Sequence, residues 1–231
     1  KSNQAIEFAQ LELDAKQFTS GKFVSLGIQR FIWREKNQGA NTAPESLAPM
    51  TFSWQVPKKN TEIEKFSFSS SKIGLQNLSL FALNLPLPSR IRQIIEQSEP
   101  RGELNDVSIT WSENKSTIPL VGGLISGQGP KFDVSGKLNN VSVKRYQDIV
   151  PGITNLTGKI LANQDQGNID LNSKNLQLVI DGFLADPKMN FDTVKGKVNW
   201  SLKNKQWLIG LDDLAVANKD LALNTKGSYL I

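Results

Sequence analysis

Apolar and polar residues alternate with a period of two along much of this chain, and this pattern constrains the fold more than any other feature. Because successive side chains of a β-strand point to opposite faces, such alternation predicts strands that have one apolar face. The alternating runs are Met50, Phe52, Trp54 and Val56; Val107, Ile109 and Trp111; Phe132, Val134, Gly136 and Leu138; Ile169 and Leu171 with Leu176, Leu178 and Ile180; Trp207, Ile209 and Leu211 with Leu214 and Val216; and Leu221, Leu223, Thr225, Gly227 and Tyr229.

Two of these runs change parity at a polar interruption. Residues 172–175 separate Leu171 from Leu176, and Asp212-Asp213 separates Leu211 from Leu214. A shift of one residue turns every later side chain to the other face of a sheet. We therefore expect a bulge or tight turn at each interruption, which keeps the apolar residues on one side.

Short polar segments between the runs predict antiparallel neighbours. Residues 163–167, 203–205 and 218–220 are each rich in Asn, Asp, Gln or Lys. A weak internal repeat of Gly flanked by Ser, Thr or Lys accompanies them, and its irregular spacing excludes a solenoid with a fixed period. These glycines are Gly21, Gly136, Gly158, Gly196 and Gly227.

A few segments depart from the strand pattern. Ser89 is a suitable N-cap for a short helix that ends at Gln97, before Glu99-Pro100. Residues 144–149 are expected to form one turn, and residues 36–49, polar with two prolines, a loop. The first 18 residues fit a strand slightly better than a helix.

The residue types that enzymes most often use are missing. The chain contains neither Cys nor His, which excludes thiol nucleophiles, imidazole bases and the commonest metal ligands. The acidic residues match no calcium-binding spacing, and adjacent Asp212 and Asp213 suit a turn better than a catalytic pair. We therefore expect no enzymatic activity, no metal site and no cofactor.

The charge of the chain points to no nucleic-acid partner. The formal net charge is +5, but single Lys residues are scattered and no Arg-rich block interleaves with aromatic residues. The sequence contains no run of about 18 apolar residues, so we expect no membrane-spanning helix. Since residues 226–231 have the pattern of a strand in progress, we expect residues 1–231 to be one section of a larger protein.

Several motifs in order resemble the YhdP branch of the AsmA-like proteins. The first comprises residues 84–88, the short helix, and Pro100-Arg101-Gly102-Glu103-Leu104-Asn105-Asp106 before a strand that ends at Trp111. The others are the P-G-hydrophobic-x-N-L-x-G-x-I pattern at residues 151–160, the strand at residues 167–173 and the hairpin pattern at residues 191–200.

This resemblance covers residues 50–231 and implies a fold, a role and a location. It implies a mainly β protein, a long, twisted, open antiparallel β-groove with one or two short helices. It also implies a periplasmic section of an inner-membrane-anchored protein, which carries phospholipid between the inner and outer membranes. The expected partners are phospholipid acyl chains, the membrane through regions outside this section, and envelope proteins.

One face of the C-terminal sheet is our candidate lipid-binding floor. Its residues alternate along consecutive strands and carry no charge. They are Ile160, Ile169, Leu171, Leu176, Leu178, Val198, Trp200, Ile209, Leu211, Leu214 and Val216.

Two other functions fit the same residues. In the first, the apolar face is the closed core of a β-sandwich module that binds carbohydrate or protein. In the second, the chain is a structural spacer of the cell envelope. Aromatic residues on strands are more often ordinary core than a ligand platform.

Overall fold

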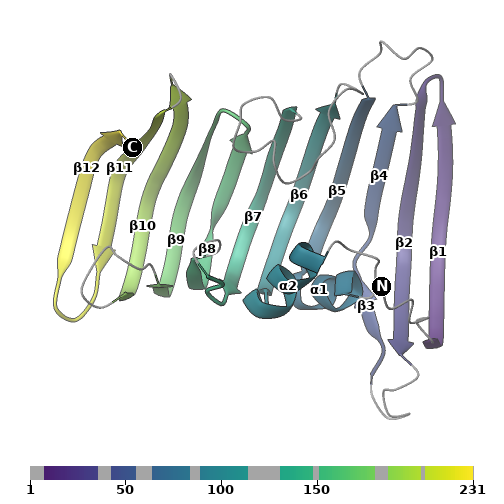
Figure 1. Cartoon of the computed structure of the whole chain (residues 1–231), viewed down its shortest axis with the longest axis horizontal. Coiled ribbons are helices and arrows are strands. Elements are labelled where there is room, and N and C mark those ends of the chain that lie inside the picture. Colours follow the sequence, from purple (N-terminus) through teal and green to yellow (C-terminus); the bar gives the residue numbers. More distant parts are fainter. Residues whose placement is uncertain are drawn as a thin grey trace.

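The computed structural model describes residues 8–35, 43–55, 64–83, 89–113, 131–147, 151–179, 187–203 and 206–230. These residues form one 12-stranded antiparallel sheet and two short helices (Figure 1). The strands are β1 (Phe8–Ser20), β2 (Phe23–Glu35), β3 (Glu45–Leu47), β4 (Met50–Gln55), β5 (Glu64–Gly74), β6 (Arg101–Glu113), β7 (Lys131–Val143), β8 (Gly152–Asn163), β9 (Gln166–Val179), β10 (Lys188–Lys203), β11 (Gln206–Ala217) and β12 (Ala222–Leu230).

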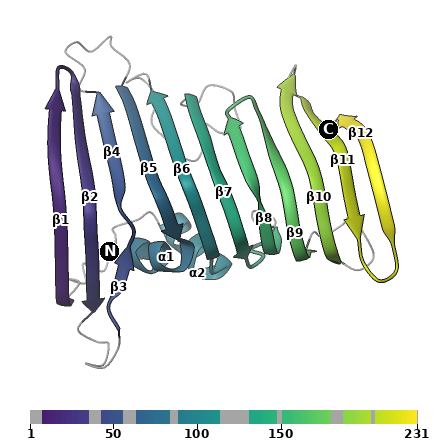
Figure 2. The same ribbon diagram turned by 180° about the vertical axis from the view of Figure 1, so that it is seen from behind.

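The sheet follows the order of the chain. Its path is β1-β2-β4-β5-β6-β7-β8-β9-β10-β11-β12, and β3 pairs with β2 beside β4. The path does not return on itself, so the sheet is open, and the described residues form no second sheet over either face (Figures 1 and 2). The expected open, antiparallel fold is therefore confirmed, and the closed sandwich is excluded.

Both helices lie on the same side of the sheet, at the end where β5 finishes and β6 starts (Figures 1 and 2). Helix α2 (Ser89–Ser98) confirms the helix expected to begin at Ser89. Helix α1 (Leu75–Leu83) follows β5 directly and was not predicted, because its apolar residues lack a clear helical period. With 9 and 10 residues, neither helix among the described residues is long enough to span a membrane.

The other local predictions that fall on described residues were mostly confirmed. Strand β1 confirms the strand expected near the N-terminus, and the expected hairpins join β8 to β9 and β11 to β12. The predicted loop at residues 36–49 contains β3, which pairs with β2. Tyr146 and Gln147 form a bridge and a turn rather than a full helical turn, while residues 148–150, 204 and 205 lie outside the described residues.

Strands β6 to β11 each contain an interior residue with positive φ. Apart from glycine, these residues are Asn or Asp, which adopt this backbone conformation more readily than other residues. Asn175, with φ of 51°, and Asp213, with φ of 46°, confirm the irregularities expected at the two changes of parity. The series is Asp106, Asn140, Asn155, Asn175, Gly196 and Asp213. Such irregularities bend strands and increase their twist, so six neighbouring strands curve together.

Side chains support the sheet where its backbone is irregular. The Ser173 hydroxyl, which is fully buried, donates to the Thr157 carbonyl at 3.0 Å and accepts from the Thr157 N–H at 2.9 Å. The Ser142 hydroxyl accepts from the Asn155 N–H at 3.0 Å. These bonds satisfy backbone groups that the interrupted ladders leave without strand partners.

Candidate functional site

A single register row of apolar residues crosses the whole sheet. Direct strand partners share a face, so the row can be followed from β1 to β12 through the pairing alone. It consists of Gln17, Leu26, Phe52, Phe68, Ile109, Val134, Ala162, Gly167, Trp200, Ile209 and Tyr229. Gln17, on the edge strand, is the one polar member, and no member is charged.

The positions that alternate with this row are polar. Ser25, Ser53, Ser67, Thr110 and Asp133 are successive strand partners on β2, β4, β5, β6 and β7. Adjacent residues of a strand point to opposite faces, so these side chains occupy the other surface of the sheet. The sheet therefore has one apolar and one polar face.

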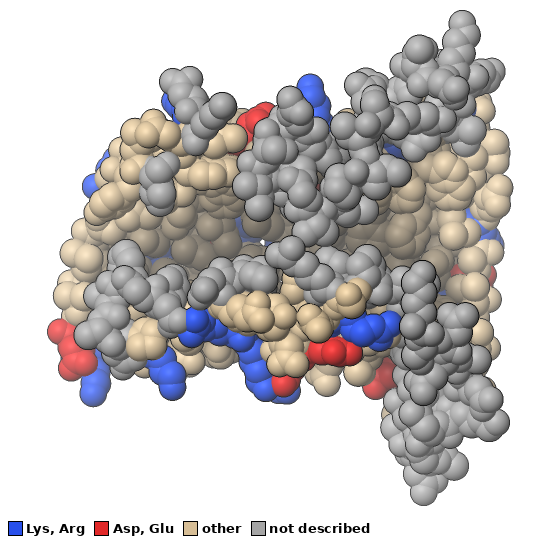
Figure 3. Space-filling model, viewed as in Figure 1, with Lys and Arg blue, Asp and Glu red and all other residues tan. Residues whose placement is uncertain are grey.

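The apolar face is hollowed. It carries α1, because Phe81 of this helix packs on Phe31 and Trp33, at 5.1 and 5.6 Å between ring centroids. Phe31 and Trp33 pair with Leu13 and Leu11 of β1, which alternate with Gln17 on one face. Seen from the helix side, the molecule has a trough along its long axis, and charged side chains gather on its lower rim (Figure 3). We call this hollow the apolar trough.

Among the described residues, only helix α1 is seen to pack on the floor of the apolar trough. Most of its residues are half-buried, and the buried apolar side chains among the described residues are few. These are Trp33, Leu47, Ile73, Val107, Leu176 and Val194. A soluble protein rarely leaves a long contiguous apolar surface without a partner, so the trough is the leading candidate for a binding surface.

The structure brings most of the predicted floor residues onto this face. Ile160, Ile169, Val198 and Leu211 are direct partners on four consecutive strands. Trp200 pairs with Ile209 in the row that crosses the sheet. Leu171 pairs with Gly196, two residues along β10 from Val198 and on the same face.

The remaining predicted residues lie beyond the irregular positions. Leu214 and Val216 pair with Thr225 and Leu223 of β12, which alternate with Tyr229 and so share its face. Leu176 pairs with Phe191 and is almost fully buried, while Leu178 pairs with Met189 and Ile153. Leu176 and Leu178 thus continue the apolar surface past Asn175. That these residues contact lipid stays a prediction.

Sequence reasoning missed the N-terminal half of the floor. Phe52, Phe68 and Ile109 lie in the same register row as Trp200, with Phe66 and Trp111 beside them. The signal was present, because residues 50–56 and 107–111 alternate as clearly as the C-terminal runs do.

The opposite face carries ion pairs on its outer surface. Lys137 lies 2.6 Å from Asp106, Lys197 lies 3.4 Å from Asp170, and the gap from Lys226 to Asp212 is 3.6 Å. All six side chains are well exposed, so each pair contributes little to stability. These ion pairs place charged side chains on the polar face of the sheet, opposite the apolar trough.

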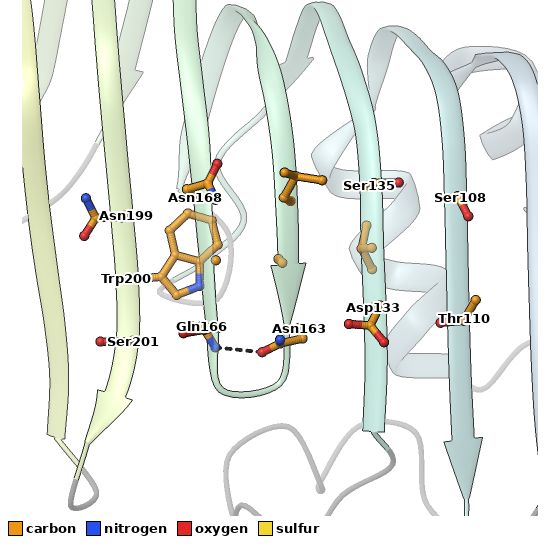
Figure 4. Close-up of a pocket in the computed structure, with 14 residues that line it drawn as sticks. Ser108, Thr110, Asp133, Ser135, Asn163, Gln166, Asn168, Asn199, Trp200 and Ser201 are labelled. Atoms are coloured by element: carbon orange, nitrogen blue, oxygen red, sulfur yellow. Dashed lines mark hydrogen bonds between the residues drawn. The ribbon is translucent and has the colours of Figure 1, made fainter.

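A shallow depression of about 520 Å³ is a second candidate site. Strands β6 to β10 supply its lining, which is mostly amide and hydroxyl side chains (Figure 4). Asn163 holds the adjoining turn, since its Oδ1 atom accepts the N–H groups of Asp165 and Gln166 at 2.9 Å. The depression spans part of the sheet, and its lining includes four members of the register row that crosses the whole sheet: Val134, Ala162, Gly167 and Trp200.

No group of three or more acidic residues within the described parts of the chain is placed to hold a metal ion. The two carboxyl groups with shifted pKa values belong to ion pairs. Hydrogen bonding to the Lys144 ammonium lowers the pKa of Glu99, and hydrogen bonding to Lys72 lowers that of Glu103. These pairs join neighbouring elements.

The chain matches one model of a known protein family. The family model described as "YhdP protein" matches residues 21–231, which is most of the sequence. The chain belongs to the YhdP protein family. The match extends the resemblance seen in residues 50–231 to β2 and β3, whereas β1 precedes the matched residues. No curated protein and no solved structure matches the chain.

Proposed function

We propose that this chain is a non-enzymatic section of a lipid conduit, whose apolar trough carries phospholipid acyl chains between the inner and outer membranes. The proposal places it in the periplasm, as part of an inner-membrane-anchored YhdP family protein. The observation that carries it is the register row from Leu26 to Tyr229, which is apolar on every strand it crosses.

The energetics of lipid movement support an open apolar trough. Burying one methylene group contributes about 0.8 kcal/mol, so exposing a lipid with about thirty acyl carbons costs over 20 kcal/mol. A continuous apolar floor offsets most of this cost at each position. Aliphatic and aromatic side chains without charge bind acyl chains with little positional preference, which keeps the barriers between positions low.

The arrangement of strands suits transport along the trough rather than storage in a closed site. The row runs across the strands, from one edge of the sheet to the other, so neighbouring floor residues repeat at the strand spacing of about 4.8 Å. The sheet is open at β1 and β12. An acyl chain on this floor therefore meets no transverse wall formed by the sheet itself.

The proposal is tested by adding one carboxylate to either face of β9. Leu171→Asp places a charge on the floor, and Asn172→Asp places one on the adjacent exposed position of the other face. We expect both variants to fold, because a carboxylate in an open trough reaches water. Lipid co-purification, measured by mass spectrometry, should fall for Leu171→Asp and stay at the parental level for Asn172→Asp.

Two results would count against the conduit. If the parental chain carries no lipid after purification from cells and takes up none from vesicles, the trough does not bind acyl chains. If Leu171→Asp and Leu178→Asp both unfold, the floor behaves as a closed core. The melting temperature and the lipid content are measured on the same preparations, so lost lipid binding is separated from lost structure.

The polar depression favours a carbohydrate or peptide ligand as a second candidate function. Its amide and hydroxyl groups match ligands rich in hydrogen-bonding groups. Binding of a neutral oligosaccharide that Asn168→Ala and Asn199→Ala abolish, in a chain without lipid, would favour this alternative.

A further inference from the structure

Five aromatic side chains form a compact group on the floor of the apolar trough. They come from three adjacent strands, β4, β5 and β6, and we call them the aromatic lane. Phe66 stacks between Trp111 and Trp54, with ring centroids 4.3 and 6.4 Å away and interplanar angles of 14° and 20°. Phe52 and Phe68 contact each other at 5.0 Å, one register row further along the strands.

Helix α1 covers the other end of the same part of the sheet. Its Phe81 packs on Trp33, whose side chain is 1% exposed, and nearby Ile73 on β5 is 5% exposed. Leu47 and Val107 are also buried. Four of the six buried apolar side chains of the described residues therefore lie on β2, β3, β5 and β6, the strands on the side of the sheet that α1 covers.

The aromatic lane is the part of the floor at this section that neither helix of the described residues covers. On β5, Phe66 and Phe68 precede Ile73, so the lane lies toward the end of the strand remote from α1 (Figure 1). The five rings remain half-buried although aromatic residues gain most from burial. On β8 to β11, in contrast, the floor is mainly aliphatic.

We propose that the aromatic lane is the passage by which acyl chains cross the section of the trough that α1 narrows. This inference rests on the proposed lipid-conduit function. Stacked rings hold a fixed surface, because each has few side-chain rotamers and its neighbours restrict them further. The lane thus keeps an apolar path open beside the helix. Flexible aliphatic side chains at the same positions would instead fold over onto α1 and fill the path.

The natural tryptophans report on this path. Trp54 and Trp111 belong to the aromatic lane, Trp200 lies on the aliphatic floor, and Trp33 lies beneath α1. Bromine atoms on an acyl chain quench an indole that they touch. The probe is phosphatidylglycerol brominated on both acyl chains, supplied from vesicles, and the control is the same lipid without bromine.

Three variants isolate the reporters by Trp→Phe substitution at the remaining Trp positions. One keeps Trp54 and Trp111, one keeps Trp200, and one keeps Trp33. We expect brominated lipid to reduce the emission of the first two variants and to leave the emission of the third unchanged. Circular dichroism shows whether each variant retains the parental fold.

The possible outcomes test the aromatic lane separately from the lipid conduit. Quenching of Trp200 without quenching of Trp54 and Trp111 overturns the aromatic lane and leaves the conduit in place. Equal quenching of Trp33 and the lane also overturns the inference, because α1 then fails to close the floor. Quenching of no tryptophan overturns the conduit itself, and the lane with it.

A second measurement covers the case in which Trp→Phe variants fail to fold. The photoreactive residue p-benzoylphenylalanine replaces Phe68 in the lane or Ser67, its neighbour on the opposite face, in a chain with all five tryptophans. Crosslinking to phosphatidylglycerol from Phe68 and not from Ser67 supports the lane. Equal crosslinking from both positions contradicts it.

Discussion

Glycines on the floor show how a single side chain can control the depth of the trough. Gly136, Gly158, Gly167, Gly196 and Gly227 pair with or neighbour apolar floor residues. A Cβ atom at Gly158 would lie 2.5 Å from the Asp170 carbonyl oxygen, so the backbones there approach too closely for a side chain. At Gly136 the nearest atom, Cγ2 of Val107, would be 3.5 Å away, which is an ordinary contact.

Gly136→Phe should therefore block the trough without unfolding the sheet. The ring projects from the floor into the space proposed for acyl chains, while the backbone has room for the new Cβ atom. We expect lipid co-purification to fall and the melting temperature to stay near that of the parent. Ser135→Phe, which adds the same ring to the opposite face, is the control. Equal lipid content in the two variants would show that this part of the floor is not used.

Asparagine and aspartate with positive φ fix the curvature of the sheet. The side chain of Asn175 is exposed, and its backbone has positive φ. A substitution there therefore changes the stability mainly through the backbone conformation. A β-branched residue is strained in this conformation by roughly 1–2 kcal/mol, and glycine is not. We expect Asn175→Val to lower the free energy of unfolding by about that amount and Asn175→Gly to lower it less, as measured by urea denaturation. A reversed order would mean that the backbone at residue 175 does not hold this conformation in solution.

At the scale of the element, strands were easier to predict from the sequence than helix α1. A strand with one apolar face leaves a period of two, and the polar turns mark its ends. Helix α2 was found because Ser89 caps it and Pro100 follows it. The residues of α1, LQNLSLFAL, are mostly apolar and contain no charge, so their pattern does not distinguish a helix from a buried strand.

Phe81→Ala tests whether α1 is held on the floor by its ring contacts. The substitution removes the aromatic contacts with Phe31 and Trp33. Since Phe81 is half-buried, we expect a loss of about 1–3 kcal/mol in the free energy of unfolding. Trp33 should become accessible to water, which shifts its fluorescence to longer wavelength in a variant that keeps this tryptophan alone. Ser79→Ala, on the same helix, is the control. Unchanged Trp33 emission in Phe81→Ala would show that other residues cover it.

At the scale of the molecule, the described part of the open sheet ends at β1 and β12, which each pair with one neighbouring strand only. On β12, Leu223, Tyr229 and Leu230 are 48%, 66% and 61% exposed, so the outermost strand is apolar as well as unpaired. Exposed edges of this kind associate readily with other strands. The structure thus predicts that the isolated chain associates through its edges.

This association should depend on concentration and weaken when charge is added at the edge. We expect Leu223→Lys combined with Tyr229→Lys to lower the average mass measured by light scattering at high protein concentration. Lys219→Arg, in the adjoining turn, keeps the charge and serves as the control. A parental chain that remains monomeric over the whole concentration range would contradict the prediction.

The sequence by itself determined the strands, their apolar faces and the positions where parity changes. These properties are local, because each follows from the alternation of a few neighbouring residues and from turn chemistry. Most of the predicted C-terminal floor residues fall on one face for the same reason: Ile160, Ile169, Val198 and Leu211 alternate correctly within their own strands and then meet as register partners.

The tertiary structure alone decided whether that face is covered. Alternation gives the same pattern for a closed sandwich core and for an open floor, since a strand's sequence does not specify what lies opposite its apolar side. The register that aligns Leu26 with Tyr229 through eight intervening strands depends on every connection between them. Trp33 and Trp54 show the difference: both lie on apolar faces of alternating strands, but α1 buries one and leaves the other in the trough.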